Sequence, residues 1–243
     1  MKKIPSCLIF VVLAAGLLAQ SPLPAQTPGS DQTPAPKIFQ EYHPPGAKGG
    51  PMVLVSDFKF YIDKYEVTNQ DYQECVAAGV CKAISNVSSG SRKTGRGVPA
   101  RAMKGFDAPN QPVVYVDQND ARTYCQWAGK RLPKEEEWLM AAQGTGSRTY
   151  PWGNQSPDCD LANYSKCKVG RTLPVGSKPA GASPYGALDM AGNVYEWVEE
   201  KVPPRGGSWY NSPKFLKITD HDGYVPGNRF STGGFRCARD GSP

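Results

Sequence analysis

The sequence has few histidines, which many metal and acid–base sites use. Among its 243 residues there are only two histidines, His43 and His221, and there is no Cys-x-x-Cys pair. A zinc site takes its ligands from several cysteine or histidine side chains, usually in closely spaced pairs. The sequence therefore argues against a zinc cluster and against any site that needs several histidines.

Long apolar runs, basic blocks and internal repeats are scarce as well. After residue 25 no apolar stretch approaches the roughly 18–20 residues that a membrane-spanning helix needs. The formal charge of +6 includes Lys2 and Lys3, and the other basic residues form no block typical of nucleic-acid binding. We therefore expect no membrane span in the mature chain and no nucleic-acid partner.

Glycine and proline, in contrast, are abundant. The chain has 26 glycines and 23 prolines, and no Gly-X-Y period that would indicate collagen. Each of these residues costs about 1–3 kcal/mol in a helix interior. A helix bundle is therefore excluded, and the composition favours an irregular fold.

Residues 1–25 have the pattern of a cleaved signal peptide. Lys2 and Lys3 precede an apolar run at residues 8–18, which is too short for a membrane span. Cleavage is expected after one of two alanines, Ala19 or Ala25. We therefore predict an exported protein, either periplasmic or extracellular.

The next segment, residues 26–51, is rich in Pro, Gly, Thr and Gln and has little apolar clustering. Such a composition buries too little apolar surface to offset the entropy of ordering, which predicts a disordered linker. Residues 52–243 then form the folded part, a length that suits one domain.

Six cysteines remain after the signal peptide, which carries Cys7, is removed. An even number of cysteines in an exported chain indicates disulfides, although six cysteines allow 15 pairings. Spacing favours two local pairs and leaves the third pair to close a loop of more than a hundred residues. The favoured pairs are Cys75 with Cys81, Cys159 with Cys167, and Cys125 with Cys237.

The start of the domain carries a strand pattern. In residues 57–63, Phe58, Phe60 and Ile62 alternate with a more polar set that includes Asp63. A period of two predicts a half-buried strand with the polar set facing solvent.

Capping residues then predict two helices. Thr68 with Asp71 three residues later is typical of a helix start, and Gly79 of its end. Asp117 predicts the start of a second helix. The apolar face of that helix comprises Ala121, Tyr124, Cys125 and Ala128.

A third helix is expected to take Pro133 as its first residue and residues 135–137, all glutamates, in its first turn. Residues 82–110 lack periodicity and indicate a long surface loop, and the chain beyond Gly144 reads as turns and short strands. The predicted class is α+β with few helices and much irregular backbone.

Several blocks resemble one known family. They read, in order, YIDKYEVTNQDY, PVVYVDQNDARTYCQWAGKRLPKEEEWLMAA, YPWGN, PVGSKPAGASPYGALDMAGNVYEWVEE, RGGSW and GFRCARD. This series is similar to the formylglycine-generating enzyme, or sulfatase-modifying factor, family over about residues 53–240. The resemblance implies an irregular C-type-lectin-like variant fold with short antiparallel strands, and a bound calcium ion.

The tryptophans and arginines of these blocks have two interpretations. We expect the tryptophan side chains to pack in the core, namely Trp127, Trp138, Trp152 and Trp197. Buried ion pairs are the alternative for Arg131 and Arg236, with partners among Glu136, Glu137 and Glu196.

The resemblance places calcium at DMAGNVYEW. Its implied ligands are the side chains of Asp189 and Glu196 and the backbone carbonyls of Gly192 and Val194. Calcium prefers such oxygen ligands. The alternative is a glycine-containing turn with two solvated acids.

The family's copper chemistry, in contrast, lacks its ligands here. Its oxidase converts a substrate cysteine to formylglycine with two cysteines that bind copper(I) shortly after a Gly-Gly-Ser block. Here Asn211 occupies the first position and a residue near Leu216 the second, while the family's active-site serine is kept as Ser208. Copper(I) prefers soft thiolates, which an amide and a hydroxyl cannot replace. We therefore expect neither copper binding nor formylglycine generation.

Iron chemistry is not expected either. A related branch of sulfoxide synthases uses a three-histidine iron site, and this domain has only His221, within Thr-Asp-His-Asp-Gly-Tyr. We read that motif as an exposed loop.

Two functions remain. The first is a binding or interaction module for a peptide, protein or glycan, with a ligand groove at Ser208, Trp209, Tyr210 and Asn211 and the 212–232 loop. The alternative is an oxidoreductase or protein-modifying enzyme of this family that works by a divergent mechanism.

Overall fold

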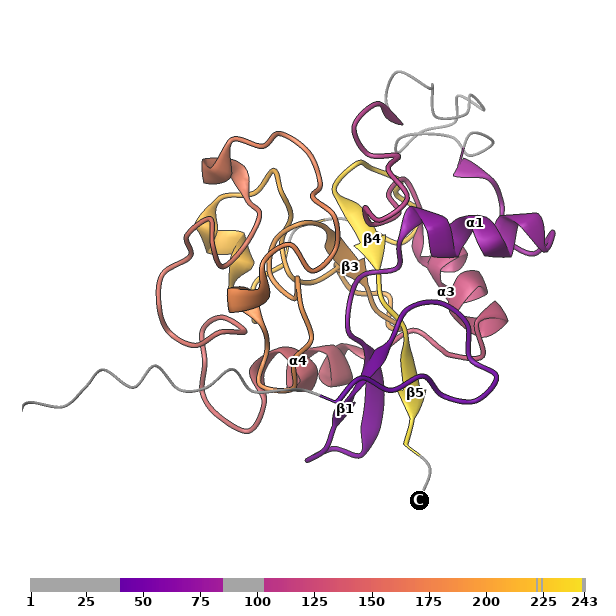
Figure 1. Cartoon of the computed structure of the whole chain (residues 1–243). Coiled ribbons are helices and arrows are strands. Elements are labelled where there is room, and N and C mark those ends of the chain that lie inside the picture. Colours follow the sequence, from indigo (N-terminus) through magenta and orange to yellow (C-terminus); the bar gives the residue numbers. More distant parts are fainter. Residues whose placement is uncertain (1–39, 85–102, 222, 224, 242–243) are drawn as a thin grey trace, which may run out of the picture. The chain divides into compact units, whose positions relative to one another are not determined.

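A computed structural model describes residues 40–84, 103–221, 223 and 225–241. The predicted signal peptide and most of the predicted linker lie outside the described residues. Helices are few and strands are short, with long irregular connections between them (Figure 1). The strands are β1 Met52–Val55, β2 Phe60–Asp63, β3 Tyr195–Trp197, β4 Gly233–Phe235 and β5 Ala238–Asp240, and the α-helices are α1 Asn69–Ala77, α3 Gln118–Trp127 and α4 Glu135–Gln143. Single 3-10 turns cover η2 Ser165–Cys167, η3 Pro179–Gly181 and η4 Pro213–Leu216.

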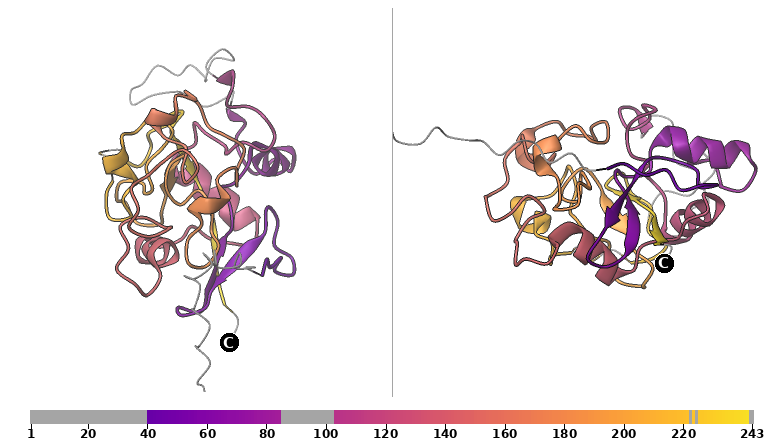
Figure 2. Two further views of the ribbon diagram at one scale, coloured as in Figure 1. Left: turned by 60° about the vertical axis from the view of Figure 1, so that its left-hand side comes forward. Right: turned by 60° about the horizontal axis from the view of Figure 1, so that its bottom comes forward.

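Two small sheets organise the domain. In the first sheet, β2 pairs antiparallel with β1 on one side and with β5 on the other. The yellow β5 therefore lies beside the indigo hairpin, as Figures 1 and 2 show from several directions. In the second sheet, β3 and β4 are parallel, with Glu196 opposite Gly234. The expectation of antiparallel strands is thus wrong for this pair, because a long connection allows β4 to return in the direction of β3.

The capping residues of the first two helices are confirmed. The side chain of Thr68 caps α1 and that of Asp117 caps α3, each in a reciprocal capping box with Asp71 and Asp120. Gly79, with a φ of 73°, follows the end of α1. Among the described residues, no helix is both long and apolar enough to cross a bilayer.

The third helix, α4, begins later than predicted. Its first helical residue is Glu135, and the N-cap Lys134 has an extended backbone, so Pro133 lies before the helix. The Glu137 carboxylate accepts the Lys134 N–H at 2.8 Å, which fixes this start. The expected run of acidic residues does occupy the first turn.

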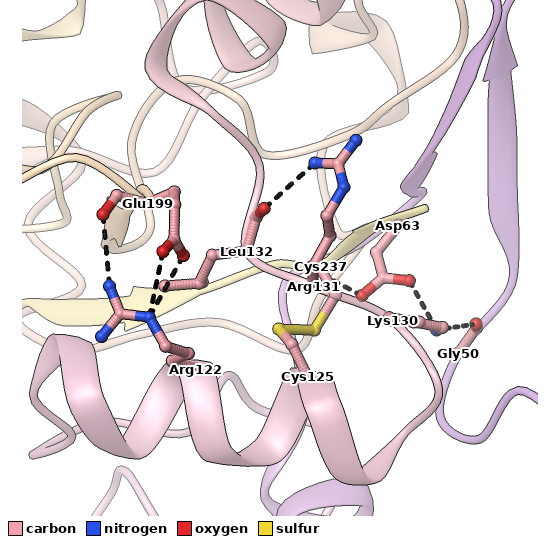
Figure 3. The surroundings of a disulfide bond; sticks show 9 residues. All are labelled: Gly50, Asp63, Arg122, Cys125, Lys130, Arg131, Leu132, Glu199 and Cys237. Carbon is pink, nitrogen blue, oxygen red and sulfur yellow. Dashed lines mark hydrogen bonds and ion pairs between the residues drawn. A yellow bond between two sulfur atoms is a disulfide. The ribbon is translucent and has the colours of Figure 1, made fainter. Parts of the chain in front are cut away.

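The predicted strand at residues 57–63 is shorter than expected, and one face is wrong. Residues 56–59 form the turn between β1 and β2. Asp63 is buried, because its carboxylate pairs with the Lys130 Nζ at 2.6 Å and accepts the Cys237 N–H at 2.9 Å (Figure 3). A buried cationic partner thus overrides the alternation of the sequence.

All three favoured disulfides are present. The Cys125–Cys237 bond joins α3 to Cys237, the second of the two residues between β4 and β5, beside the Asp63–Lys130 pair (Figure 3). It therefore ties the middle of the domain to its C-terminal end.

The core takes two of the four tryptophans. Trp138 and Trp197 are fully buried, whereas Trp127 and Trp152 are half-buried and pack at the edges of the clusters. The expectation of four core tryptophans is therefore wrong for two of them.

Residues 40–51, assigned to the linker by composition, contact the domain. Tyr42 forms an antiparallel bridge with Met52, and the Lys48 N–H donates to the Ala128 carbonyl at 2.9 Å. The ordered contacts therefore begin before residue 52.

Candidate functional site

A buried ion pair lies between the two strands of the second sheet. Glu196 lies in the middle of β3, and Arg236 directly follows β4. Both side chains are completely buried, and the Arg236 Nε and Nη2 donate to the two Glu196 carboxylate oxygens at 2.7 and 2.8 Å. The Trp138 Nε1 donates to the same carboxylate at 2.7 Å. The pair therefore links both strands to α4, as one of the two sequence interpretations proposed.

Two more carboxyl groups are buried near this pair. Glu66 accepts the Val194 N–H at 3.1 Å and the Asn193 Nδ2 at 2.6 Å, and Asp189 accepts the Gly176 N–H at 2.6 Å. Burial raises the pKa of Glu66 well above its usual range, and the charges of Asp189 and Glu196 raise it further. Burial likewise raises the pKa of Asp189 to about 6. One cation, Arg236, cannot neutralise all three carboxyl groups, Glu66, Asp189 and Glu196. The cluster therefore favours protonation of its carboxyl groups.

This arrangement does not fit the calcium set that the resemblance implies. Both Glu196 oxygens are already bound by Arg236 and Trp138, and one Asp189 oxygen is bound by a backbone N–H. Nor do three His, Cys, Asp or Glu side chains converge on a metal position anywhere in the described part of the chain. The alternative of two solvated acids also differs from the structure, because both acids are buried.

The two carbonyl positions of that set lie in a tight turn. Gly192 has a φ of 86°, and a Cβ there would lie 2.5 Å from the backbone oxygen of Asn163. Only glycine suits this position, so the segment requires its glycine for packing whether or not a metal binds.

We expect Asp189→Asn to stabilise the domain at pH 7. The raised pKa of about 6, against 3.8 in the unfolded chain, means that the folded state binds the extra proton. Stability from this group is therefore lost as the pH rises from about 4 to 6, by roughly 3 kcal/mol in full. Asparagine keeps an oxygen for the Gly176 N–H but carries no charge. Urea denaturation at several pH values measures the change.

The exposed Asp107→Asn is the matched control, and its pH profile should follow the wild type. A slope in Asp189→Asn equal to that of the wild type would contradict the role of Asp189. Thermal melts with calcium and with a chelator test separately whether the site binds calcium. A calcium-dependent rise in Tm that Asp189→Ala abolishes would show that calcium displaces the observed contacts.

Other side chains occupy the positions of the family's copper cysteines. The Ser208 hydroxyl, fully buried, donates to the Asn211 Oδ1 and accepts the Tyr210 N–H at 3.3 Å. Leu216 is buried in an apolar cluster with Tyr150 and other residues. The amide of Asn211, bound by Ser208, stands at the first thiolate position, and an aliphatic side chain lies near the second.

Three aromatic side chains meet beside this position, and we call Phe106, Trp209 and Tyr210 the aromatic platform. The Trp209 ring lies 5.5 Å from that of Phe106 and 5.6 Å from that of Tyr210. Its indole donates to the Ser231 carbonyl at 3.0 Å, and its backbone N–H donates to the Asn193 carbonyl at 3.0 Å. Tyr210 is 69% exposed. A fixed indole therefore supports a tyrosine ring that faces solvent.

Sequence reasoning missed Phe106, because it lies in the segment assigned to a surface loop. The Asn69 Nδ2 donates to the Phe106 carbonyl at 2.8 Å, and the Gln111 Nε2 donates to the Gly105 carbonyl at 3.0 Å. A lone phenylalanine in a polar loop was the available signal. These amides hold the loop so that the ring reaches Trp209.

The rest of the expected groove is partly closed. Ser208 is buried and does not present its side chain to solvent. Within the 212–232 segment, Leu216 and Ile218 are core residues. Trp209, Tyr210 and Asn211 keep at least partial exposure, so the groove reduces to these residues and Phe106.

The two histidines lie at exposed positions. His43 precedes β1, and His221 contacts Arg205 through a backbone bridge. Neither is part of a converging metal-ligand group among the described residues.

Two cavities have other linings. One of about 540 Å³ lies between α1 and residues 103–109. The other, about 250 Å³, adjoins Arg122, Leu132 and Glu199, which Figure 3 shows near the Cys125–Cys237 bond. No residue of the aromatic platform lines either of them.

Known proteins show similarity over most of the domain. The bovine (Bos taurus) protein named inactive C-alpha-formylglycine-generating enzyme 2 is 36% identical over 52% of this chain, which spans about half (50%) of that relative. Hercynine oxygenase of Mycobacterium tuberculosis is 36% identical over 54% of this chain and 37% of its own length. The solved structure of PvdO from Pseudomonas aeruginosa superposes with a TM-score of 0.59 at 24% identity, covering 83% of this chain and 92% of PvdO. That last likeness shows the shared fold.

The model of one protein family matches residues 28–241, which is nearly the whole chain. The matching residues include every block that resembles the formylglycine-generating enzyme family. The chain belongs to the family of sulfatase-modifying factor enzyme 1-like domains.

Proposed function

We propose that the chain is an exported binding module of this family, and that it holds a peptide or glycan ligand on the aromatic platform. The main support for this proposal is the exposed ring of Tyr210, which packs on Trp209, a residue fixed by two hydrogen bonds. Tyrosine and tryptophan offer large contact areas at a low cost in conformational entropy and are enriched at binding sites.

The surroundings of the platform support this role. Asn211 adds a half-buried amide at its edge. Aromatic faces next to neutral polar groups suit both pyranose rings and extended peptides. Export is supported by three disulfides, which persist in oxidising compartments.

A divergent oxidoreductase is the second candidate, and it is favoured by the similarity to hercynine oxygenase. The side chains present argue against copper and against histidine-bound iron. Asn211 and a residue near Leu216 stand in place of the thiolates, and His221 is an isolated exposed histidine. Such an enzyme would need a different redox group.

Binding of the mature chain to immobilised peptide and glycan collections tests the proposal. Trp209→Ala and Tyr210→Ala should each weaken the retained signals about tenfold or more, the size of a binding hot spot. The matched control is Tyr42→Ala, which removes another partly exposed tyrosine that stacks on a neighbouring ring, Tyr61, at 4.6 Å. Equal binding by all three variants would refute the platform as the ligand site.

A further inference from the structure

The three disulfides differ in their access to solvent. Cys75, Cys125 and Cys237 are fully buried, and Cys81 is 7% exposed. Cys159 and Cys167, in contrast, are both half-buried and lie at the edge of an apolar cluster. Of the disulfides in the described part of the chain, the Cys159–Cys167 bond is thus the one with two partly exposed ends.

The charges around this bond are separated by sign. Asp158 and Asp160 flank Cys159, whereas Lys166 and Lys168 flank Cys167, and all four side chains belong to exposed residues. None of the four forms an ion pair in the described part of the chain. Positive side chains stabilise a neighbouring thiolate, and negative ones disfavour it. Negative charge is therefore better accommodated at Cys167 than at Cys159.

The disulfide also lies beside the positions that hold copper cysteines in the family. The Ser165 N–H, inside the loop that the bond closes, donates to the Asn211 carbonyl at 3.1 Å. Leu216 is buried in the same cluster against which Cys159 and Cys167 pack. A pair of linked sulfurs thus adjoins the Asn211–Leu216 segment without occupying it.

We propose that the Cys159–Cys167 disulfide is a thiol–disulfide exchange site that oxidises cysteine thiols of a peptide. A peptide thiolate attacks the Cys159 Sγ, and the S–S bond breaks with its electron pair moving to the Cys167 Sγ. A second peptide thiolate then attacks the peptide sulfur of the mixed disulfide and releases the Cys159 thiolate. The peptide dithiol is thereby oxidised to a disulfide by two electrons, and the Cys159–Cys167 pair is reduced to two thiols.

The charge pattern sets the direction of the first step. The sulfur that leaves more readily is the one whose thiolate is stabilised, which here is Cys167 between two lysines. The mixed disulfide therefore forms on Cys159. This reaction does not depend on binding at the aromatic platform, so either proposal can fail alone.

The first experiment exposes the folded mature chain to glutathione, followed by alkylation and peptide mapping. We expect Cys159 and Cys167 to become reactive about tenfold or more faster than the four buried cysteines, with glutathione trapped on Cys159. Equal rates for all three disulfides would overturn the proposal, as would trapping confined to Cys167.

The second experiment tests the lysines. Lys166→Ala/Lys168→Ala should slow the exchange by about three- to tenfold, because the departing Cys167 thiolate loses its positive neighbours. Lys104→Ala/Lys201→Ala removes two exposed lysines elsewhere and should leave the rate unchanged. An equal rate in both double variants would contradict the leaving-group assignment.

The third experiment uses a peptide with two cysteines. One equivalent of the oxidised chain should convert about one equivalent of the peptide to its disulfide, and Cys159→Ser/Cys167→Ser should abolish the conversion. Peptide oxidation that persists in this variant would refute the site. Tyr42→Ala is the control outside both sites, and it should exchange with glutathione at the wild-type rate.

Discussion

Replacing Cys125 and Cys237 together with alanine is expected to lower the free energy of unfolding by about 4–5 kcal/mol. The bond spans 112 residues, so it removes much of the conformational entropy of the unfolded chain. Both cysteines are fully buried, and the backbone N–H of Cys237 donates to the Asp63 carboxylate. Urea denaturation of the wild type and the double variant measures the loss.

The Cys75–Cys81 pair provides the matched control, because it closes a loop of only six residues. The same double substitution there should cost only about 2 kcal/mol in the chain-entropy model. Equal losses for the two pairs would contradict the role assigned to the long loop.

Arg236→Met should be similarly disruptive at neutral pH, with a loss of about 3–5 kcal/mol. The substitution leaves the Glu196 carboxylate buried without its cation and close to Glu66 and Asp189, whose charges already act on one another. It also removes the donors that Arg236 offers to the Asp63 and Leu188 carbonyls at 2.9 and 2.7 Å. Thermal and urea unfolding at pH 7 measure the effect.

The companion variant is Glu196→Gln/Arg236→Met. Glutamine keeps an oxygen for the Trp138 Nε1 and removes the unpaired charge, so the double variant should regain part of the lost stability. If the double variant is less stable than Arg236→Met alone, the buried charge is not the cause of the loss.

Much of the fold could be predicted from signals between residues that are close in sequence. The caps of α1 and α3 were predicted because a capping box lies within four consecutive residues, as in Thr68 to Asp71. The disulfides were predicted because two pairs are close in sequence and leave one partner for Cys125. These features need no knowledge of distant contacts.

The errors have a common physical origin in contacts between distant residues. Asp63 is buried because Lys130, 67 residues away, neutralises it. Phe106 joins the candidate site only through the ring of Trp209, which belongs to another part of the chain. Glu196 fits two sequence interpretations, a calcium ligand and an ion-pair partner, and the fold pairs it with Arg236, 40 residues away.

We propose that this family member keeps the fold without the copper-dependent oxidation of a cysteine. The most direct test is titration of the mature chain with copper(I), followed by incubation with a cysteine peptide and analysis of the peptide by mass spectrometry. The account predicts no tight one-to-one copper(I) complex and no aldehyde in the peptide. Stoichiometric copper(I) binding together with formylglycine in the peptide would contradict it.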